Sequence, residues 1–293
     1  DPAQPAGSGR FRDEDEPRAL MAKVCLTPFG VLGTRLLADK SIEQKGTAPD
    51  EQTAIVDAGG HHVVNPEGPS KALGAAKSIY QWVGIADAEA YDPEVVEALP
   101  SPGHAKYHDY GVGRHVIHAF GPDLRKLPPR PAEDGTDAAW DEAVAVLGQT
   151  YCAILTEFAD SELTNLRLLP VSGGIFAGAY LERMAELTVT ALQLGFGMLS
   201  AEKLALLAVG RRLELCVFAE SEYAAFQEVL DEDPAEPAGH GDGHGSGHGH
   251  ADHGHSHDDG GCCGGHGDGG HEGGHGHGHY ALIVRSLSLD AKS

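Results

Sequence analysis

A strand-like apolar run leads directly into a glycine pair within residues 166–180. Gly173, Gly174 and Gly178 let the backbone approach a ligand closely, because a residue without Cβ adopts positive φ at little steric cost. The helix expected from about Leu181 adds unpaired N–H groups and the positive end of a helix dipole. This pattern predicts a phosphate-binding turn, and an ordinary glycine-rich strand-to-helix connection is the alternative.

A second stretch with ligand chemistry lies at residues 240–279, which hold twelve of the 18 histidines and two vicinal cysteines. Imidazoles two and four residues apart on one chain can converge on Zn, Ni or Cu, and thiolates add soft ligands. The composition predicts that metal binds in vitro, and a low-complexity loop without a metal-binding role is the alternative. The candidate metal ligands are His248, His250, His253, His255, His257, Cys262, Cys263, His275, His277 and His279.

Other polar residues stand near predicted strand ends. Asp57 ends an apolar run, where it could act as a general base, accept a ribose hydroxyl or cap a loop N–H. His118 lies inside an apolar run, where a histidine is most often a neutral, hydrogen-bonded core residue. His61 and His62 follow a glycine pair and are either polar contacts in a cleft or exposed loop residues. The sequence contains no recognisable local signature of a Ser/His/Asp or Cys/His set, so it gives nucleophilic catalysis no support.

Strand and helix patterns alternate between these candidates. Consecutive apolar residues at 53–58 indicate a strand buried on both faces, as in a parallel sheet covered by helices. Alternation of strands and helices predicts a three-layer α/β domain. Further strands are expected at 19–26, 115–119, 166–171 and 213–218, and helices from Ser70 onward, around 144–158, at 181–199 and at 221–230.

Composition shifts divide the chain into four parts. Residues 1–18 are rich in Pro, Gly, Asp and Glu and are expected to be disordered. One domain is expected over 19–230, followed by a disordered His/Gly/Asp-rich insertion at 231–279. Residues 280–289 return to an apolar pattern, so 280–293 are expected to form a C-terminal edge strand and tail.

Composition also narrows the classes of partner. The 293 residues are 41% hydrophobic, enough for one substantial core. A formal net charge of -23 argues against nucleic acid and anionic membrane surfaces as partners. No apolar run approaches the ~18 residues of a membrane span, and we expect a soluble protein. Cys25, Cys152 and Cys216 stand singly in apolar segments, which predicts buried thiols in a reducing intracellular compartment.

Several predicted strand-to-loop junctions resemble those of the macro domain family, the ADP-ribose-binding α/β/α fold, in the family's order along roughly 19–230. Residues 54–60, Ala-Ile-Val-Asp-Ala-Gly-Gly, resemble the family's strand and Asn-Ala-Ala-Asn loop, and residues 68–73 resemble its next helix start. Residues 115–122, His-Val-Ile-His-Ala-Phe-Gly-Pro, resemble the Val-Ile-His-x-Val-Gly-Pro signature, the most specific of these matches. Residues 169–178 resemble the second phosphate loop, usually Pro-x-Ile-Ser-Thr-Gly-Val-Tyr-Gly.

The resemblance implies a three-layer α/β/α fold with a mixed, mostly parallel central sheet, and binding of ADP-ribose or a related nucleotide diphosphate. In this reading Ser172 donates a hydroxyl hydrogen bond, and Phe176 packs beside the distal ribose or anchors the core. The implied ligand contacts are Asp57, Gly59, Gly60, Gly68, Ser172, Gly173, Gly174, Ile175, Phe176 and Gly178.

The first of the two ligand loops departs from the family's pattern. Gly60 stands where the family has its last loop asparagine, and residues 64–68 replace the triple glycine of the first diphosphate loop. Glu67 would place a negative charge near a diphosphate, which is unfavourable. We therefore expect weak binding with little or no hydrolysis. Two alternatives stay open: a domain that has lost its ligand and serves as a scaffold subunit of a larger complex, and a His-rich metal-binding module.

Overall fold

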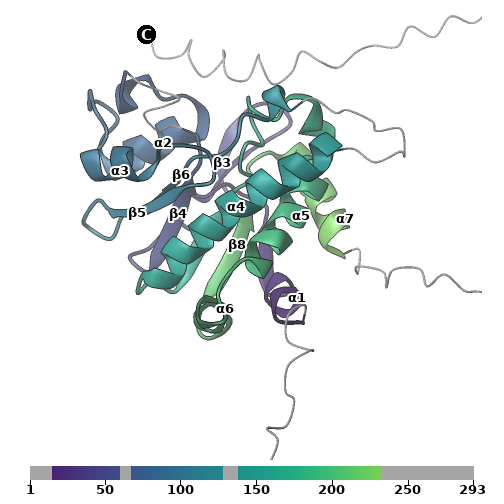
Figure 1. Cartoon of the computed structure of the whole chain (residues 1–293). Coiled ribbons are helices and arrows are strands. Elements are labelled where there is room, and N and C mark those ends of the chain that lie inside the picture. The colour runs from purple at the N-terminus through teal and green to yellow at the C-terminus, as the bar shows by residue number, and fades with distance from the viewer. Residues whose placement is uncertain (1–14, 60–66, 128–137, 232–293) are drawn as a thin grey trace, which may run out of the picture.

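A six-stranded sheet forms the centre of the computed structural model, which describes residues 15–59, 67–127 and 138–231 (Figure 1). Its strand order is β1-β8-β7-β4-β6-β5, and every neighbouring pair is parallel except β5 with β6. The mixed, mostly parallel sheet is therefore confirmed. The strands are β1 (Val24–Thr27), β4 (Thr53–Asp57), β5 (Ala105–Asp109), β6 (His115–Ala119), β7 (Asn165–Leu168) and β8 (Arg212–Cys216), with a separate hairpin of β2 (Thr34–Leu36) and β3 (Ile42–Gln44).

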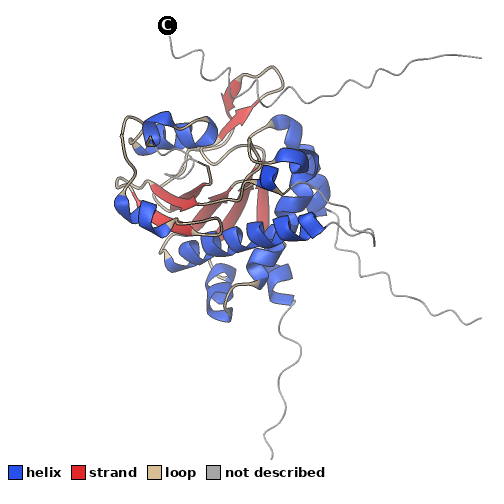
Figure 2. Cartoon of the chain, turned by 45° about the horizontal axis from the view of Figure 1, so that its top comes forward, coloured by secondary structure: helices blue, strands red, loops and turns tan. Residues whose placement is uncertain are grey.

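Helices lie on both sides of the sheet, which confirms the three-layer α/β/α architecture (Figure 2). On one face the larger core includes α1 (Asp15–Met21), α4 (Ala138–Asp160), α5 (Met184–Gly197), α6 (Ala201–Ala208) and α7 (Glu220–Asp231). The smaller core on the other face includes α2 (Gly74–Val83), and the short α3 (Pro93–Ala98) follows it in the chain. Three 3-10 helices complete the described elements: η1 (Pro69–Lys71), η2 (Leu124–Lys126) and η3 (Gly178–Arg183).

Burial explains why the central elements form. All five residues of β4 are buried, which is the position of a strand covered on both faces. In α4, Leu147, Tyr151, Ile154 and Phe158 recur at three- and four-residue steps and are fully buried. Each such side chain contributes about 1.5–3 kcal/mol relative to exposure. β4 ends at Asp57, and the hydroxyl of Tyr151 in α4 hydrogen-bonds to the backbone that follows β7, so both elements position the candidate site.

Glycines allow α4 and α5 to pack closely. A Cβ added to Gly195 in α5 would lie 3.0 Å from the Cβ of Tyr151 and 3.1 Å from the backbone nitrogen of Cys152, both in α4. A Cβ added to Gly148 in α4 would lie 2.7 Å from a methyl carbon of Leu194. The two helix backbones therefore approach at a distance that only glycine permits without a shift of neighbouring atoms.

Three predicted elements near loops were wrong in type or boundary. Residues 19–26 are not one strand, because α1 extends to Met21 and β1 begins at Val24. Ser70 lies in η1 and caps no helix; α2 begins at Gly74 after Leu73, whose side chain makes no capping hydrogen bond. The helix expected at 181–199 consists of η3 followed by α5.

Two further expectations need correction. Residues 15–18 belong to α1, although 1–18 were expected to be disordered; the rest of that segment lies outside the described residues. Cys25 is exposed on the sheet edge, whereas Cys216 is buried and Cys152 half-buried. The predicted insertion from residue 232 onward and the predicted strand at 280–289 also lie outside the described residues.

Among the described helices, none is long and apolar enough to cross a membrane by itself; one pair, Gly178–Gly197 with Ala201–Ala208, meets the length and composition limits only jointly, across a bend of 117°.

Candidate functional site

The stretches that contain Gly59 and Gly173 follow two adjacent parallel strands, β4 and β7, and so lie at the same end of the sheet, where the strands have their carboxyl ends. β4 pairs with β7 in the register Ile55 to Arg167, and the chain then leaves β4 toward β6 and β7 toward β8. The strand order thus reverses between β4 and β7. In open α/β sheets this reversal opens a crevice at the carboxyl ends of the strands, where ligands bind.

The loop after β6 joins the same place. A Cβ added to Gly121 would lie 2.5 Å from Cγ1 of Val171, 2.9 Å from Oγ of Ser172 and 3.8 Å from the carbonyl oxygen of Ala58. The loops that follow β4, β6 and β7 therefore meet at Gly121. The glycine of the Gly-Pro signature is required by this contact between loops.

Ser172 positions the loop after β7. Its hydroxyl donates to the carbonyl oxygen of Pro122 at 2.6 Å, and only 7% of the residue is exposed. Its φ of 62° is unusual for a residue other than glycine, and such a conformation persists where the surrounding contacts hold it. The hydroxyl that was expected to reach a ligand thus joins the β6 and β7 loops.

Three successive backbone N–H groups in this turn pair with no group in the part of the chain that the structure describes. Those of Gly174, Ile175 and Phe176 have no hydrogen-bond acceptor among the described residues. Just before them, the N–H of Gly173 donates to the carbonyl oxygen of Pro170 at 3.1 Å. A Cβ added to Gly174 would meet no atom within 4 Å, so the turn faces open space there. Successive unpaired N–H groups in a turn can form an anion-binding concavity.

Arg125 lies against this turn, although no sequence motif predicted it. Its guanidinium carbon is 5.0 Å from the ring centroid of Phe176, and a Cβ on Gly178 would lie 3.0 Å from its Cα. Its Nε and Nη2 donate to the carboxylate of Asp123 at 2.7 and 2.9 Å, and half of its side chain is exposed. The signal in the sequence was the basic pair Arg125-Lys126, which begins three residues after Pro122 of the Gly-Pro signature.

Asp57 is enclosed in a hydrogen-bonded network. Its Oδ2 accepts from the Tyr80 hydroxyl at 2.6 Å and from Nδ1 of His118 at 3.0 Å, and the residue is 2% exposed. Nε2 of His118 lies 2.8 Å from the hydroxyl oxygen of Tyr110. Burial acts to raise the pKa of Asp57, but the hydrogen bond and charge of His118 and the Tyr80 hydrogen bond hold it below its usual value. Oδ1 also accepts a long hydrogen bond of 3.5 Å from the N–H of Gly59.

The remaining candidate ligand contacts have different surroundings. A Cβ on Gly59 would meet no atom within 4 Å, whereas one on Gly68 would lie 2.3 Å from the carbonyl oxygen of Glu89. Gly68, with φ of 93°, is therefore required by packing against that backbone. Ile175 is 50% exposed on the turn after β7. Gly60 lies outside the described residues.

Residues that could hold a metal fall in two groups. All of the candidate ligands between His248 and His279 lie outside the described residues. Within the described ranges, Asp92, Glu94 and His108 place one ligand atom each within 4.8 Å of one another. The ammonium of Lys106 already lies 2.6 Å from Oε1 of Glu94, which neutralises one of the two carboxylates.

Comparison with known proteins found similar solved structures, whereas no protein-family model and no curated protein matches the chain. The Trypanosoma brucei macrodomain in complex with ADP-ribose is 17% identical over 75% of this chain and 74% of that chain, with a TM-score of 0.39. The Oceanobacillus iheyensis macrodomain with ADP is 17% identical over 62% of this chain and 85% of that chain, with a TM-score of 0.41.

An alphavirus structure, P23pro-zbd, is 20% identical over 62% of this chain, with a TM-score of 0.38. This chain spans only 21% of its length. The fold class of the present chain rests on its own sheet order, and the candidate site rests on contacts within the chain.

Proposed function

We propose that the loops after β4, β6 and β7 bind ADP-ribose or a related nucleotide diphosphate. The observation that carries this proposal is the run of unpaired N–H groups at Gly174, Ile175 and Phe176, at the reversal of strand order and beside the cation of Arg125. Backbone donors and an adjacent guanidinium are what a phosphate group requires. The resemblance of residues 115–122 and 169–178 to macro domain motifs favours a nucleotide over a free anion.

In this proposal each group has a distinct role. The N–H groups of the turn donate to diphosphate oxygens, and Arg125 adds one charge through the guanidinium nitrogen that Asp123 does not bind. The ring of Phe176 holds the guanidinium in place by a cation–π contact, and Ile175 offers apolar surface to the sugar or base.

Affinity should be modest because the surroundings are acidic. Asp123 already offsets part of the charge of Arg125, Glu67 is exposed near the first loop, and the chain carries a net charge of -23. We expect a Kd on the order of 10 μM or weaker, equivalent to about 7 kcal/mol or less.

Hydrolysis of the bound nucleotide should be near background. Asp57, the candidate general base, is enclosed by Tyr80 and His118, and a general base must lie within hydrogen-bond reach of the proton it takes. Gly60 has no side chain to orient a water molecule. We therefore propose a binding domain and not an efficient hydrolase; rapid removal of ADP-ribose from a modified protein would contradict this.

Titration calorimetry of the full chain with ADP-ribose tests the proposal. Arg125→Ala should weaken binding by about 5- to 10-fold, because a charge-assisted hydrogen bond is lost. Lys126→Ala is the matched control: the Lys126 side chain is 80% exposed and its ammonium lies 3.8 Å from Oδ2 of Asp123, an exposed ion pair that contributes little, so affinity should change less than about 2-fold. AMP, which lacks the diphosphate, should bind more weakly than ADP. Absence of heat up to millimolar ADP-ribose would favour the scaffold alternative.

A further inference from the structure

Strand β1 forms an edge of the six-stranded sheet that no other described strand covers. It pairs in parallel with β8 on its inner side, from Val24 opposite Leu213 to Thr27 opposite Cys216. On its outer side, alternate residues direct N–H and C=O groups away from the sheet. Such an edge is a template for another strand.

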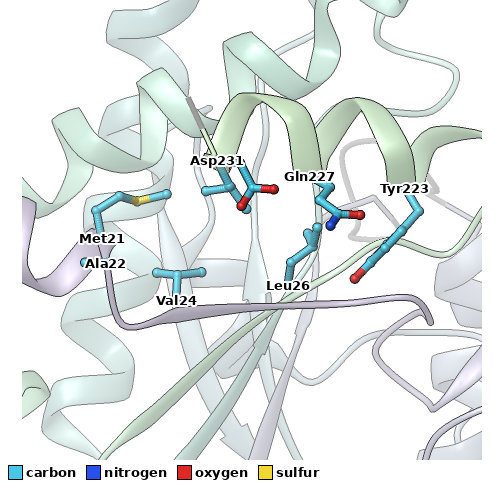
Figure 3. A pocket seen from close by; sticks show the side chains of 8 residues that line it. Met21, Ala22, Val24, Leu26, Tyr223, Gln227 and Asp231 are labelled. Carbon is cyan, nitrogen blue, oxygen red and sulfur yellow. The ribbon is translucent and has the colours of Figure 1, made fainter. Parts of the chain in front are cut away.

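A pocket of about 310 Å³ adjoins this edge (Figure 3). Val24 and Leu26 of β1 form one wall, and Tyr223 and Leu230 of α7 form the other. Figure 3 shows the labelled side chains of the strand and of the helix pointing into the space between them, with Met21 at one end. Apolar side chains therefore lie beside strand backbone that pairs with no other described strand, and polar atoms, among them those of Gln227, make up the larger part of the exposed lining.

One acidic group is among the residues that line this pocket. Asp231, the last residue of α7, lines the pocket, is exposed and takes part in no ion pair with a described residue. The pocket thus fits a strand that brings apolar side chains, a positive charge and main-chain polar groups together. It is also the point from which the chain continues beyond the described residues.

Residues 280–289, Tyr-Ala-Leu-Ile-Val-Arg-Ser-Leu-Ser-Leu, have this chemistry. The segment is rich in strand-forming residues and has one cation, Arg285, and no carboxylate. Because side chains alternate in a strand, Ile283, Arg285, Leu287 and Leu289 would share one face. That face combines apolar groups with the cation, as the pocket combines apolar walls with Asp231.

We propose that residues 280–289 add to the outer side of β1 as a seventh strand, with the face of Ile283, Leu287 and Leu289 over the pocket and Arg285 facing Asp231. Main-chain hydrogen bonds along the edge and side chains in the pocket are the two elements of strand addition. The connection through residues 232–279 is long, and the cost of closing a loop grows slowly with its length. Attachment to the same chain raises the effective concentration of this segment over that of a second copy.

Hydrogen–deuterium exchange of the full chain, read on the peptide that covers β1, tests the proposal. Proline lacks the N–H that a central position in a strand ladder needs, so Ile283→Pro should release the segment. The outward amides of β1 should then exchange at least about 10-fold faster than in the wild type, while the peptide covering α4 stays protected. Gly264→Pro, in the His-rich stretch, is the control and should leave β1 unchanged. Equal exchange of β1 in the wild type and Ile283→Pro would overturn the proposal.

Disulfide trapping identifies the occupant of the edge. Cys25 is exposed on the face of β1 opposite Val24 and Leu26. In a chain with Cys262→Ser and Cys263→Ser, a cysteine at Ser286 or Ser288 should form a bond to Cys25 within one molecule, whereas Leu287→Cys, on the other face, should not. Cross-links found only between two molecules, or β1 protection that rises with protein concentration, would assign the edge to a second copy and overturn the proposal.

Discussion

Asp57 depends on two donors from distant parts of the chain. The Tyr80 hydroxyl and Nδ1 of His118 both donate to its Oδ2 in a buried environment. A hydrogen bond to a charged group contributes about 1.5–3 kcal/mol, and its loss leaves part of the carboxylate unsatisfied. We therefore expect Tyr80→Phe to lower the free energy of unfolding by about 1.5–3 kcal/mol in urea titrations at pH 7.

A matched hydroxyl provides the control for this substitution. The Tyr107 hydroxyl lies 2.8 Å from Nδ1 of His115, at a half-buried position and without a charged acceptor. Tyr107→Phe should therefore cost less, about 0.5–1.5 kcal/mol. Equal losses in the two variants would show that the charge of Asp57 contributes nothing beyond an ordinary hydrogen bond.

The same carboxylate should give a pH dependence in acid. The pKa of Asp57 is lower in the folded protein than its usual value, so the unfolded state binds the proton more readily. The resulting stabilisation is present above the unfolded pKa of about 3.9 and is lost as the pH falls through the folded pKa. The free energy of unfolding should thus decrease below about pH 4, and Asp57→Asn should flatten this decrease. An unchanged slope in Asp57→Asn, measured by urea titration at each pH, would contradict the assignment.

Among the elements, the pair of α4 and α5 makes the strictest demand on sequence. A Cβ on Gly195 would press on backbone atoms of α4, whereas one on Gly197, at the exposed end of α5, would meet no atom within 4 Å. Gly197→Ala should stabilise by about 0.5–1 kcal/mol through helix propensity. Gly195→Val should destabilise by about 1–3 kcal/mol because the helices must separate. Thermal unfolding of both variants measures the difference, and similar effects would refute close packing at Gly195.

Elements buried on both faces were predictable from sequence. Ile55 in β4 and Ile117 in β6 belong to continuous apolar runs, and the spacing of apolar residues identified α4. β5 was missed because its residues, Ala-Lys-Tyr-His-Asp, are half-buried or exposed at the sheet edge and carry little apolar signal. α1 was assigned to a strand because an apolar run as short as 19–21 does not distinguish a helical period from an extended one.

Within the candidate site, only the glycine-containing turn was predictable from the sequence. Gly173 and Gly174 were identified because glycine signals a backbone turn in any context. Arg125 reaches the turn from another loop, and this contact exists only once β6 and β7 are both in the sheet. The enclosure of Asp57 requires Tyr80 and His118, which are 23 and 61 residues away in the chain. Side-chain partners at such separations follow from tertiary packing and not from local pattern.

At the scale of the whole molecule, the histidine-rich stretch should make metal binding depend steeply on pH. Neutral imidazole is the ligand form and histidine titrates near pH ~6.5, so protons compete with Zn and Ni below neutrality. We expect several ions with affinities on the order of micromolar, weakening sharply between about pH 7 and 5.5, in equilibrium dialysis of the full chain.

Serine at all ten candidate ligands is the control for this metal prediction. It should abolish most of the binding and leave the melting temperature nearly unchanged, because the described core contains none of these residues. A large fall in the melting temperature of this variant, or of the wild type with chelator, would reveal a structural metal site.

The pairing of β1 with β8 has a consequence for synthesis of the chain. Val24 lies opposite Leu213, so almost the whole described chain must leave the ribosome before the first strand finds its neighbour. At about 5–20 residues per second this delay is on the order of ten seconds or more. During that time Val24 and Leu26 have neither β8 nor α7 to cover them. Strand β1 therefore waits without its sheet neighbour while residues 28–213 are translated, an interval in which a chaperone can cover it.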